Sequence, residues 1–235
     1  MKLLMTTRAD KSIVAMTNLT HPIMKDFCKK WNCDFLELSG TPPIMSDDNH
    51  PHFRIMDLYK LFNDYDRIIN IDSDMVITDN CPNPFEEVPE NAIGTIFEDV
   101  GSRRSVRVDK IQAIQQAYGN VNWNKGYINT GIIICSKQHK DIFQPINGKY
   151  WTAWGSDDVH IGYQIRKLGH TLHELSFKWN HMTMFSEGWN NNADRFNSYI
   201  IHYAGRGQFN TKISRIENIK NDIANIYKEQ YNESK

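Results

Sequence analysis

The chain alternates short apolar runs with longer segments in which apolar residues recur every three or four positions. The short runs predict buried strands over residues 3–6, 34–38, 67–71, 92–97 and 127–135. The periodic segments predict amphipathic helices over residues 14–31, 52–63 and 159–168. Strands separated by helices favour an α/β fold with a mostly parallel central sheet and helices on both faces.

The last third of the chain predicts one more strand, over residues 199–203, and a polar helix with an isoleucine stripe over 213–231. No internal repeat, linker or composition shift divides the 235 residues. We therefore expect a single domain over residues 1–235, with the polar C-terminal helix beginning at about residue 211.

Charge and hydropathy exclude some partners. Lys plus Arg number 27 and Asp plus Glu number 28, so the basic surplus typical of a nucleic-acid-binding protein is missing. The first eight residues do not form a signal peptide, and no apolar stretch predicts a transmembrane segment. We expect a cytoplasmic protein whose four cysteines are reduced.

The strongest candidate site follows the predicted strand at 67–71. Asp72 and Asp74 stand one residue apart, with Ser73 between them and the apolar triplet 75–77 after them. Burying two like charges together costs free energy unless a cation neutralises them. Hard divalent cations favour carboxylate and phosphate oxygens, and ligands of α/β sheets bind beyond the carboxyl ends of strands. The pattern predicts a site for a divalent metal and a diphosphate, although Asp and Ser are also common turn residues.

The segment 65–77, followed by Asn-Pro-Phe-Glu at 83–86, resembles the hallmark segment of GT-A fold glycosyltransferases. It is most similar to family 8, the group of glycogenin and the bacterial lipopolysaccharide galactosyltransferases. The resemblance implies a single GT-A (Rossmann-like) domain that moves a sugar from a nucleotide-sugar donor, with a UDP-sugar favoured, to a glycan, lipid-linked or protein acceptor. It also implies a Mn²⁺ or Mg²⁺ ion, with Asp74 the firmer ligand, Asp72 shared between metal and ribose, and Ser73 beside the donor.

Three later segments match the family in the expected order. Asn129, in 127–131, resembles the asparagine against donor sugar and acceptor, although a strand-edge Asn before a bulge glycine is the plain alternative. Asp157 and Asp158 match an Asp-Gln pair at a helix start, where carboxylates also serve as caps. His202 resembles the third manganese ligand, in a His-x-x-Gly motif that ends at Gly205, although a late lone histidine is more often structural.

The resemblance implies further donor contacts before the strand at 67–71. The loop after the first strand receives the base and ribose in the family, and a later basic residue faces the donor phosphates. The matching residues here are Thr6, Thr7, Arg8, Asp10, Arg54 and Lys60. The last two are equally consistent with solvated helix charges. Arg103, Arg104 and Arg107 form a basic cluster in a predicted loop, which either closes over the diphosphate or is a solvated face.

The chain departs from the family after Gly205. The family motif continues to a lysine on the diphosphate and a Pro-Trp pair, whereas Gln208 stands at the lysine position and no Pro-Trp follows. Arg206 or Lys212 are the candidates to supply that charge. The tryptophans and tyrosines between 150 and 189 are candidates for an acceptor site, although aromatic residues in that number more often form core.

The stereochemical outcome stays open at this point. His202 favours a retaining enzyme, in which Asn129 and Asp157 position sugar and acceptor. The segment 154–158 also resembles the Trp-Gly-x-Glu-Asp segment of inverting GT-A enzymes, which makes Asp157 or Asp158 a candidate general base. A sugar nucleotidyltransferase is a further alternative, but the chain lacks its Gly-rich loop after the first strand. A non-catalytic sugar-binding module does not need paired aspartates with a matched histidine.

Overall fold

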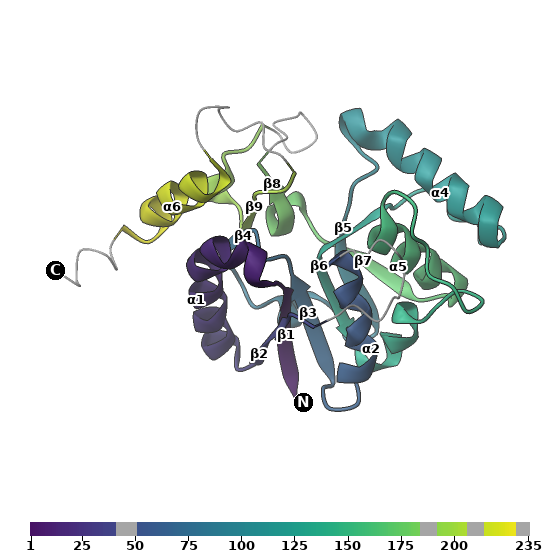
Figure 1. The fold of residues 1–235 in the computed structure, drawn as a ribbon, viewed down its shortest axis with the longest axis horizontal. Coiled ribbons are helices and arrows are strands. Elements are labelled where there is room, and N and C mark those ends of the chain that lie inside the picture. The colour runs from purple at the N-terminus through teal and green to yellow at the C-terminus, as the bar shows by residue number, and fades with distance from the viewer. Residues whose placement is uncertain (41–50, 184–191, 206–213, 229–235) are drawn as a thin grey trace.

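The computed structural model describes residues 1–40, 51–183, 192–205 and 214–228. A six-stranded sheet in the order β2-β1-β3-β6-β5-β7 forms its centre (Figure 1). Its strands are β1 (Leu3–Arg8), β2 (Asp34–Leu38), β3 (Arg67–Ile71), β5 (Ala92–Phe97), β6 (Ile128–Ser136) and β7 (Thr171–Glu174). β6 runs antiparallel to β3 and β5, and the other pairs are parallel. The predicted α/β architecture with a mostly parallel sheet is confirmed.

Helices cover both faces of this sheet (Figure 1). The helices of the described residues are α1 (Val14–Trp31), α2 (Leu58–Leu61), α3 (Pro84–Glu87), α4 (Arg104–Tyr118), α5 (Ser156–Lys167) and α6 (Arg215–Ile226). Of these, α4 packs on α5 and α6 packs on α1. Alternate strand residues face opposite layers. Met5 and Ile69 pack in the same core cluster as Phe27 of α1, whereas Leu4 and Ile68 pack in the cluster that contains Ile161 of α5.

Two segments differ from their predicted structure. The segment 52–63 consists of a 3-10 turn (Pro51–Asp57) followed by the short α2. The basic segment predicted as a loop is a 3-10 turn (Gly101–Arg103) that leads into α4. That prediction was wrong because α4 buries only Ile111 and Ile114, which leaves too few apolar residues to show a helical period.

A second sheet of three strands lies beside the first, in the order β4-β9-β8. Its strands are β4 (Met75–Ile77), β9 (Ile200–His202) and β8 (His181–Met182). β9 is antiparallel to β4, and the register sets Met75 opposite His202. Ile219 of α6 packs in one cluster with Val76 and Ile201, so the isoleucine stripe of α6 covers this small sheet.

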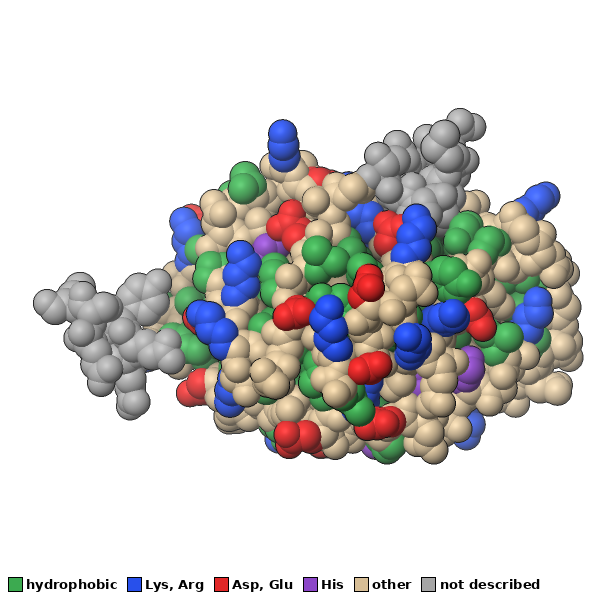
Figure 2. All heavy atoms as spheres, turned by 90° about the horizontal axis from the view of Figure 1, so that it is seen from below, with side chains coloured by type: hydrophobic (Ala, Val, Ile, Leu, Met, Phe, Trp, Pro, Cys, Tyr) green, Lys and Arg blue, Asp and Glu red, His purple; other side chains and the backbone are tan. Residues whose placement is uncertain are grey.

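Figure 2 shows lysines and arginines interspersed with aspartates and glutamates over one face of the molecule. No one-sign patch gathers on the described part of that face, in keeping with 27 basic and 28 acidic residues in the chain. Within the described ranges, no helix is both long enough and apolar enough to cross a membrane.

Candidate active site

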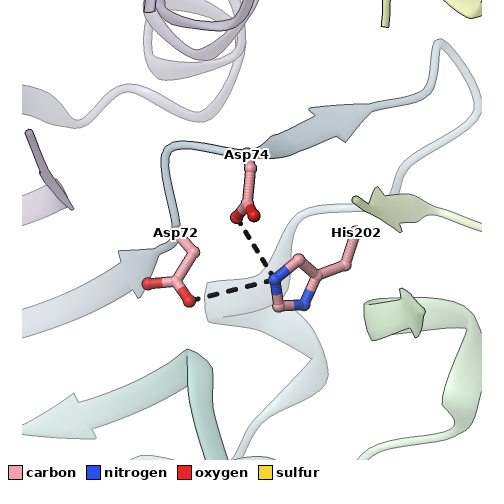
Figure 3. A group of neighbouring side chains, drawn as sticks. All are labelled: Asp72, Asp74 and His202. Carbon is pink, nitrogen blue, oxygen red and sulfur yellow. Dashed lines mark ion pairs between the residues drawn. The ribbon is translucent and has the colours of Figure 1, made fainter. Parts of the chain in front are cut away.

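Asp72, Asp74 and His202 meet where the two sheets adjoin (Figure 3). β3 ends just before Asp72 and β4 begins just after Asp74, while His202 is the last residue of β9. The His202 Nε2 atom lies 3.2 Å from Asp74 Oδ1 and 3.9 Å from Asp72 Oδ2. A Cβ atom on Gly131 would lie 2.6 Å from Asn129 Oδ1 and 3.0 Å from His202 Cε1, so glycine at this position leaves room for both side chains.

A chain of buried and partly buried hydrogen bonds fixes which His202 nitrogen faces the carboxylates. Asn129 accepts from the Gly131 backbone N–H through Oδ1 (2.9 Å) and donates through Nδ2 to Glu98 Oε1 (2.5 Å), so its amide orientation is set. Asn180 must then donate through Nδ2 to Asn129 Oδ1 (2.8 Å), which turns its own Oδ1 to His202 Nδ1 (2.7 Å). Nδ1 therefore carries a hydrogen, and Nε2 points at the aspartates.

The pKa shifts of His202 and Asp74 favour positive charge at this cluster, next to the aspartates. Burial alone would lower the pKa of His202, but Asp74 and Asp72 outweigh it and raise that pKa. Burial alone would raise the pKa of Asp74, but His202 and Arg215 outweigh it and lower that pKa. Arg215 Nη1, from α6, lies 3.2 Å from Asp74 Oδ2. The site thus stabilises the Asp74 carboxylate in its charged form.

The residues of this cluster fit a divalent cation. Two carboxylate oxygens and one imidazole nitrogen lie within 4.8 Å of one another. This mainly oxygen set with one imidazole suits Mn²⁺ or Mg²⁺ better than a thiol-binding metal. The hydrogen bond that His202 Nδ1 donates to Asn180 Oδ1 is the outer contact that orients a metal-binding histidine and leaves its other nitrogen for the ion.

Arg8, at the end of β1, joins the Asp72 side of the site to α5. Its guanidinium donates to Asp72 Oδ1 (Nε, 3.2 Å), to Asp157 Oδ2 (Nη1, 2.5 Å) and to the backbone oxygen of His52 (Nη1, 2.9 Å). Burial alone would lower the pKa of Arg8, but the two aspartates raise it, and Arg8 in turn lowers the pKa of the buried Asp157. Asp157 is therefore a charged partner of Arg8.

Asp158 has a different environment from its neighbour. Its Oδ1 accepts hydrogen bonds from the Thr130 backbone N–H (2.7 Å) and hydroxyl (2.8 Å). Burial, Asp157 and Glu98 raise the pKa of Asp158 well above its usual value. The two adjacent carboxyl groups of α5 thus differ in proton affinity, which is the arrangement expected where one of them takes up a proton.

An open cavity of about 800 Å³ brings most of the predicted site residues together. Those that line it are Arg8, Asp72, Ser73, Asp74, Asn129, Asp157, Asp158, His202 and Gly205. Its other wall is formed by the segment 152–156, which leads into α5. The carboxyl ends of β1 and β3, the start of α5 and the end of β9 all contribute to this cavity, in the place that open α/β sheets offer to ligands.

Five predicted donor contacts do not line this cavity. The side chains of Thr6 and Thr7 are buried, and the Thr7 hydroxyl lies 3.0 Å from the Ser73 hydroxyl beneath the site. Arg54 is turned to the Ala9 carbonyl (3.0 Å) and to Asp10 Oδ2 (3.2 Å).

Lys60 extends into solvent on α2, 3.7 Å from Asp57. Neither Arg54 nor Lys60 lines the cavity, so the expectation that one of them faces the donor phosphates stays a prediction. Arg206, Gln208 and Lys212 lie outside the described residues.

Sequence reasoning missed three residues of this region: Glu98, Asn180 and Arg215. Glu98 directly follows β5, so the rule that sites lie after strand ends could have found it. Its carboxylate is buried and accepts a hydrogen bond from Arg107 Nε at Oε2 (2.7 Å). Arg107, a residue of the predicted basic cluster, thus contacts the site through Glu98, which in turn binds Asn129. Asn180 and Arg215 carry no sequence signal, because their roles depend on partners far along the chain.

No family model matches the sequence, and no curated protein is similar to it. Solved structures do match. A glycosyltransferase involved in the glycosylation of the major capsid of PBCV-1 aligns with a TM-score of 0.61 and 14% identity, over 93% of this chain and 98% of that chain. The galactosyltransferase LgtC, solved with donor and acceptor sugar analogs, aligns with a TM-score of 0.56 and 13% identity, over 96% of both chains.

The apo glycosyltransferase GlyE of Streptococcus pneumoniae TIGR4 aligns with a TM-score of 0.56 and 11% identity, over all of this chain and 64% of that chain. These likenesses concern the fold. The chain has the fold of the GT-A glycosyltransferases, as its Asp-x-Asp segment predicted.

Proposed function

We propose that this protein is a divalent-metal-dependent glycosyltransferase that moves a sugar from a nucleotide-sugar donor, a UDP-sugar by preference, to an acceptor hydroxyl. The observation that carries the proposal is the convergence of Asp72, Asp74 and His202 Nε2 on the rim of a cavity in a glycosyltransferase fold. Such a donor set would hold Mn²⁺ or Mg²⁺, which when bound neutralises charge on a departing nucleoside diphosphate.

The protein groups around the cluster have separable tasks. Asn180 keeps the His202 ring turned so that Nε2 faces the aspartates. Arg8 holds Asp72 and Asp157 on opposite sides of one guanidinium, which fixes the distance from the metal cluster to α5. Arg215 lines the cavity beside Asp74, and its charge is available to a diphosphate oxygen, in the role of the family lysine at whose position Gln208 stands.

We favour a retaining reaction, in which the acceptor hydroxyl attacks from the face of the leaving group. Asp157 is charged and bound to Arg8 and to the Thr130 hydroxyl (2.7 Å), so it suits positioning better than proton transfer. An inverting reaction is the second candidate, and the raised pKa of Asp158 favours that residue as its general base.

Binding experiments test the proposal directly. Thermal-shift measurements with UDP-, GDP- and dTDP-sugars, each with and without Mn²⁺, are expected to show stabilisation by one donor class that requires the metal. Stabilisation that is equal in excess chelator would contradict the metal site. A nucleotidyltransferase would instead respond to a nucleoside triphosphate with a sugar phosphate.

The anomeric configuration of the product then decides between the two mechanisms. Proton NMR of the first product formed is expected to show the configuration of the donor. An inverted product, together with a loss of activity of about 10³-fold in Asp158→Asn, would assign Asp158 as the base instead.

A further inference from the structure

Trp154 is an exposed aromatic residue on the cavity wall that the segment 152–156 forms. Its side chain is 54% exposed and lines the cavity together with Thr152, Ser156 and Asp158. Single exposed apolar residues are common on protein surfaces and need no explanation by themselves. Trp154 differs because its accessible surface belongs to the same cavity as the Asp72, Asp74 and His202 cluster.

The structure holds Trp154 in place from outside the cavity. The Arg107 guanidinium lies 4.7 Å from the centre of the indole ring and 5.0 Å from the centre of the Tyr127 ring, so it links the two aromatic rings. The Lys110 ammonium lies 5.4 Å from the indole. Neither cation lines the cavity, whereas Trp154 does, and Trp154 is 54% exposed.

The backbone next to Trp154 is also fixed. Gly155 has φ +82°, a left-handed conformation that glycine adopts without strain, and a Cβ atom there would lie 2.5 Å from the Tyr127 hydroxyl. Arg107 is anchored to the buried Glu98, whose Oε1 accepts from Asn129 on the cavity lining. The indole is therefore preorganised on the same buried network that orients His202.

We propose that Trp154 is the platform on which a pyranose ring of the acceptor stacks, so that the acceptor is a glycan. This inference rests on the proposed function. The C–H face of a pyranose covers an indole, while its hydroxyl groups find hydrogen-bond partners in Thr152, Ser156 and Asp158 on the same wall. A lipid alcohol would need a continuous apolar wall, and a peptide hydroxyl brings no ring to stack on Trp154.

The test compares acceptors and variants. The enzyme is incubated with its donor, Mn²⁺ and one of three kinds of acceptor. These are saccharides (methyl pyranosides and labelled oligosaccharides), peptides that contain serine and threonine, and a long-chain alcohol. We expect transfer to saccharides. Trp154→Ala is expected to raise the KM for the saccharide about tenfold or more, while Trp154→Phe, which keeps an aromatic face, stays within about threefold of wild type.

A matched control is Val106→Ala on α4, because Val106 is 46% exposed and does not line the cavity. It is expected to leave all kinetic constants unchanged. Transfer only to peptides or to the alcohol would overturn the inference, as would a saccharide KM that is equal in Trp154→Ala and wild type. A wild-type protein that binds no nucleotide sugar with Mn²⁺ would instead refute the proposed function, so the two failures are distinguishable.

Discussion

The two walls of the cavity are built differently. On the metal side, Asp72, Asp74 and His202 come from the ends of three strands, and each has charged partners in a buried or half-buried setting. On the acceptor side, the segment 152–156 is largely exposed and carries one preorganised aromatic ring, Trp154. A substitution on the first wall leaves a buried charged group without its partner. A substitution on the second wall removes only contact area.

The contrast suggests that donor chemistry and acceptor choice are carried by separate parts of the structure. Substitutions on the metal side should then affect reaction rate and stability together, and those of exposed side chains on the acceptor side, such as Trp154, should affect acceptor affinity alone. Four measurements test this division, and the expected effects decrease in order.

The largest effect is expected for Asp74→Asn, which should lower the rate of sugar transfer by about 10³-fold. Loss of one carboxylate ligand forfeits several kcal/mol of charge stabilisation by the metal. The measurement is kcat/KM at saturating Mn²⁺. Asp79→Asn is the matched control, because Asp79 is an exposed aspartate just after β4 and does not line the cavity. Wild-type activity in Asp74→Asn, or in excess chelator, would refute the metal site.

Arg8→Met should destabilise the metal-free protein by about 3–5 kcal/mol, because two carboxylates, Asp72 and Asp157, lose their shared cation. Urea unfolding at neutral pH measures this loss, and Mn²⁺ should restore part of it by binding beside Asp72.

Lys29→Met provides the comparison, since the exposed pair between Lys29 and Asp26 is worth less than about 1 kcal/mol. Equal losses in Arg8→Met and Lys29→Met would show that the buried ion pairs of Arg8 contribute no more to the free energy of unfolding than an exposed pair.

Asn180→Ala should weaken Mn²⁺ binding by about 10–100-fold, since it removes the outer contact that orients His202. Electron paramagnetic resonance of free Mn²⁺ measures the affinity without any substrate. Nitrogen NMR of the metal-free protein should show that the Nδ1–H form of His202 loses its preference. Asn91→Ala, at an exposed position, is the control. Unchanged Mn²⁺ affinity and unchanged nitrogen chemical shifts would show that Asn180 does not orient His202.

The smallest effect should come from acid, and it should act on the acceptor side. His160 is buried beneath this wall, where Nδ1 accepts from the Trp151 backbone N–H (3.2 Å) and Nε2 lies 2.8 Å from the Gln144 carbonyl. Burial lowers the pKa of His160 to about 4. Because the folded pKa lies below the unfolded value of about 6.5, this contribution is present above pH 6.5 and is lost as the pH falls towards 4.

His160 alone should therefore reduce the free energy of unfolding by about 2 kcal/mol between pH 7 and pH 5. Urea unfolding at the two pH values measures the loss, and His160→Asn should show a loss smaller by about that amount. Equal losses in the variant and the wild type would mean that His160 does not carry the acid sensitivity.

Local pattern predicted much of the fold. The helix over 14–31 and the strands over 34–38, 67–71 and 92–97 have the same bounds in the structure as in the sequence analysis. Each of them has enough apolar residues at the right period to reveal its buried face. The helix α4 was missed because it buries few apolar residues, and the short strands β4, β7 and β8 are too brief to show any period.

The candidate site was only partly predictable. Asp72 and Asp74 could be found because they follow a buried strand, and His202 because its segment resembles the His-x-x-Gly motif of the family. Asn180 could not be found, since its amide matters only through Asn129 and His202, which lie 51 and 22 residues away. Its role depends on hydrogen bonds that a linear pattern does not contain.

The sequence by itself determined the α/β class, the strand that precedes Asp72-Ser73-Asp74, and the residue types that suit a divalent metal and a diphosphate. Only the tertiary structure decided which side chains meet there. Arg8 and Asp157 are 149 residues apart and form one buried ion pair, and β9 reaches β4 across more than a hundred residues. Periodicity reports how each segment is buried, whereas the meeting of distant segments is set by strand pairing and by the pairing of buried charges.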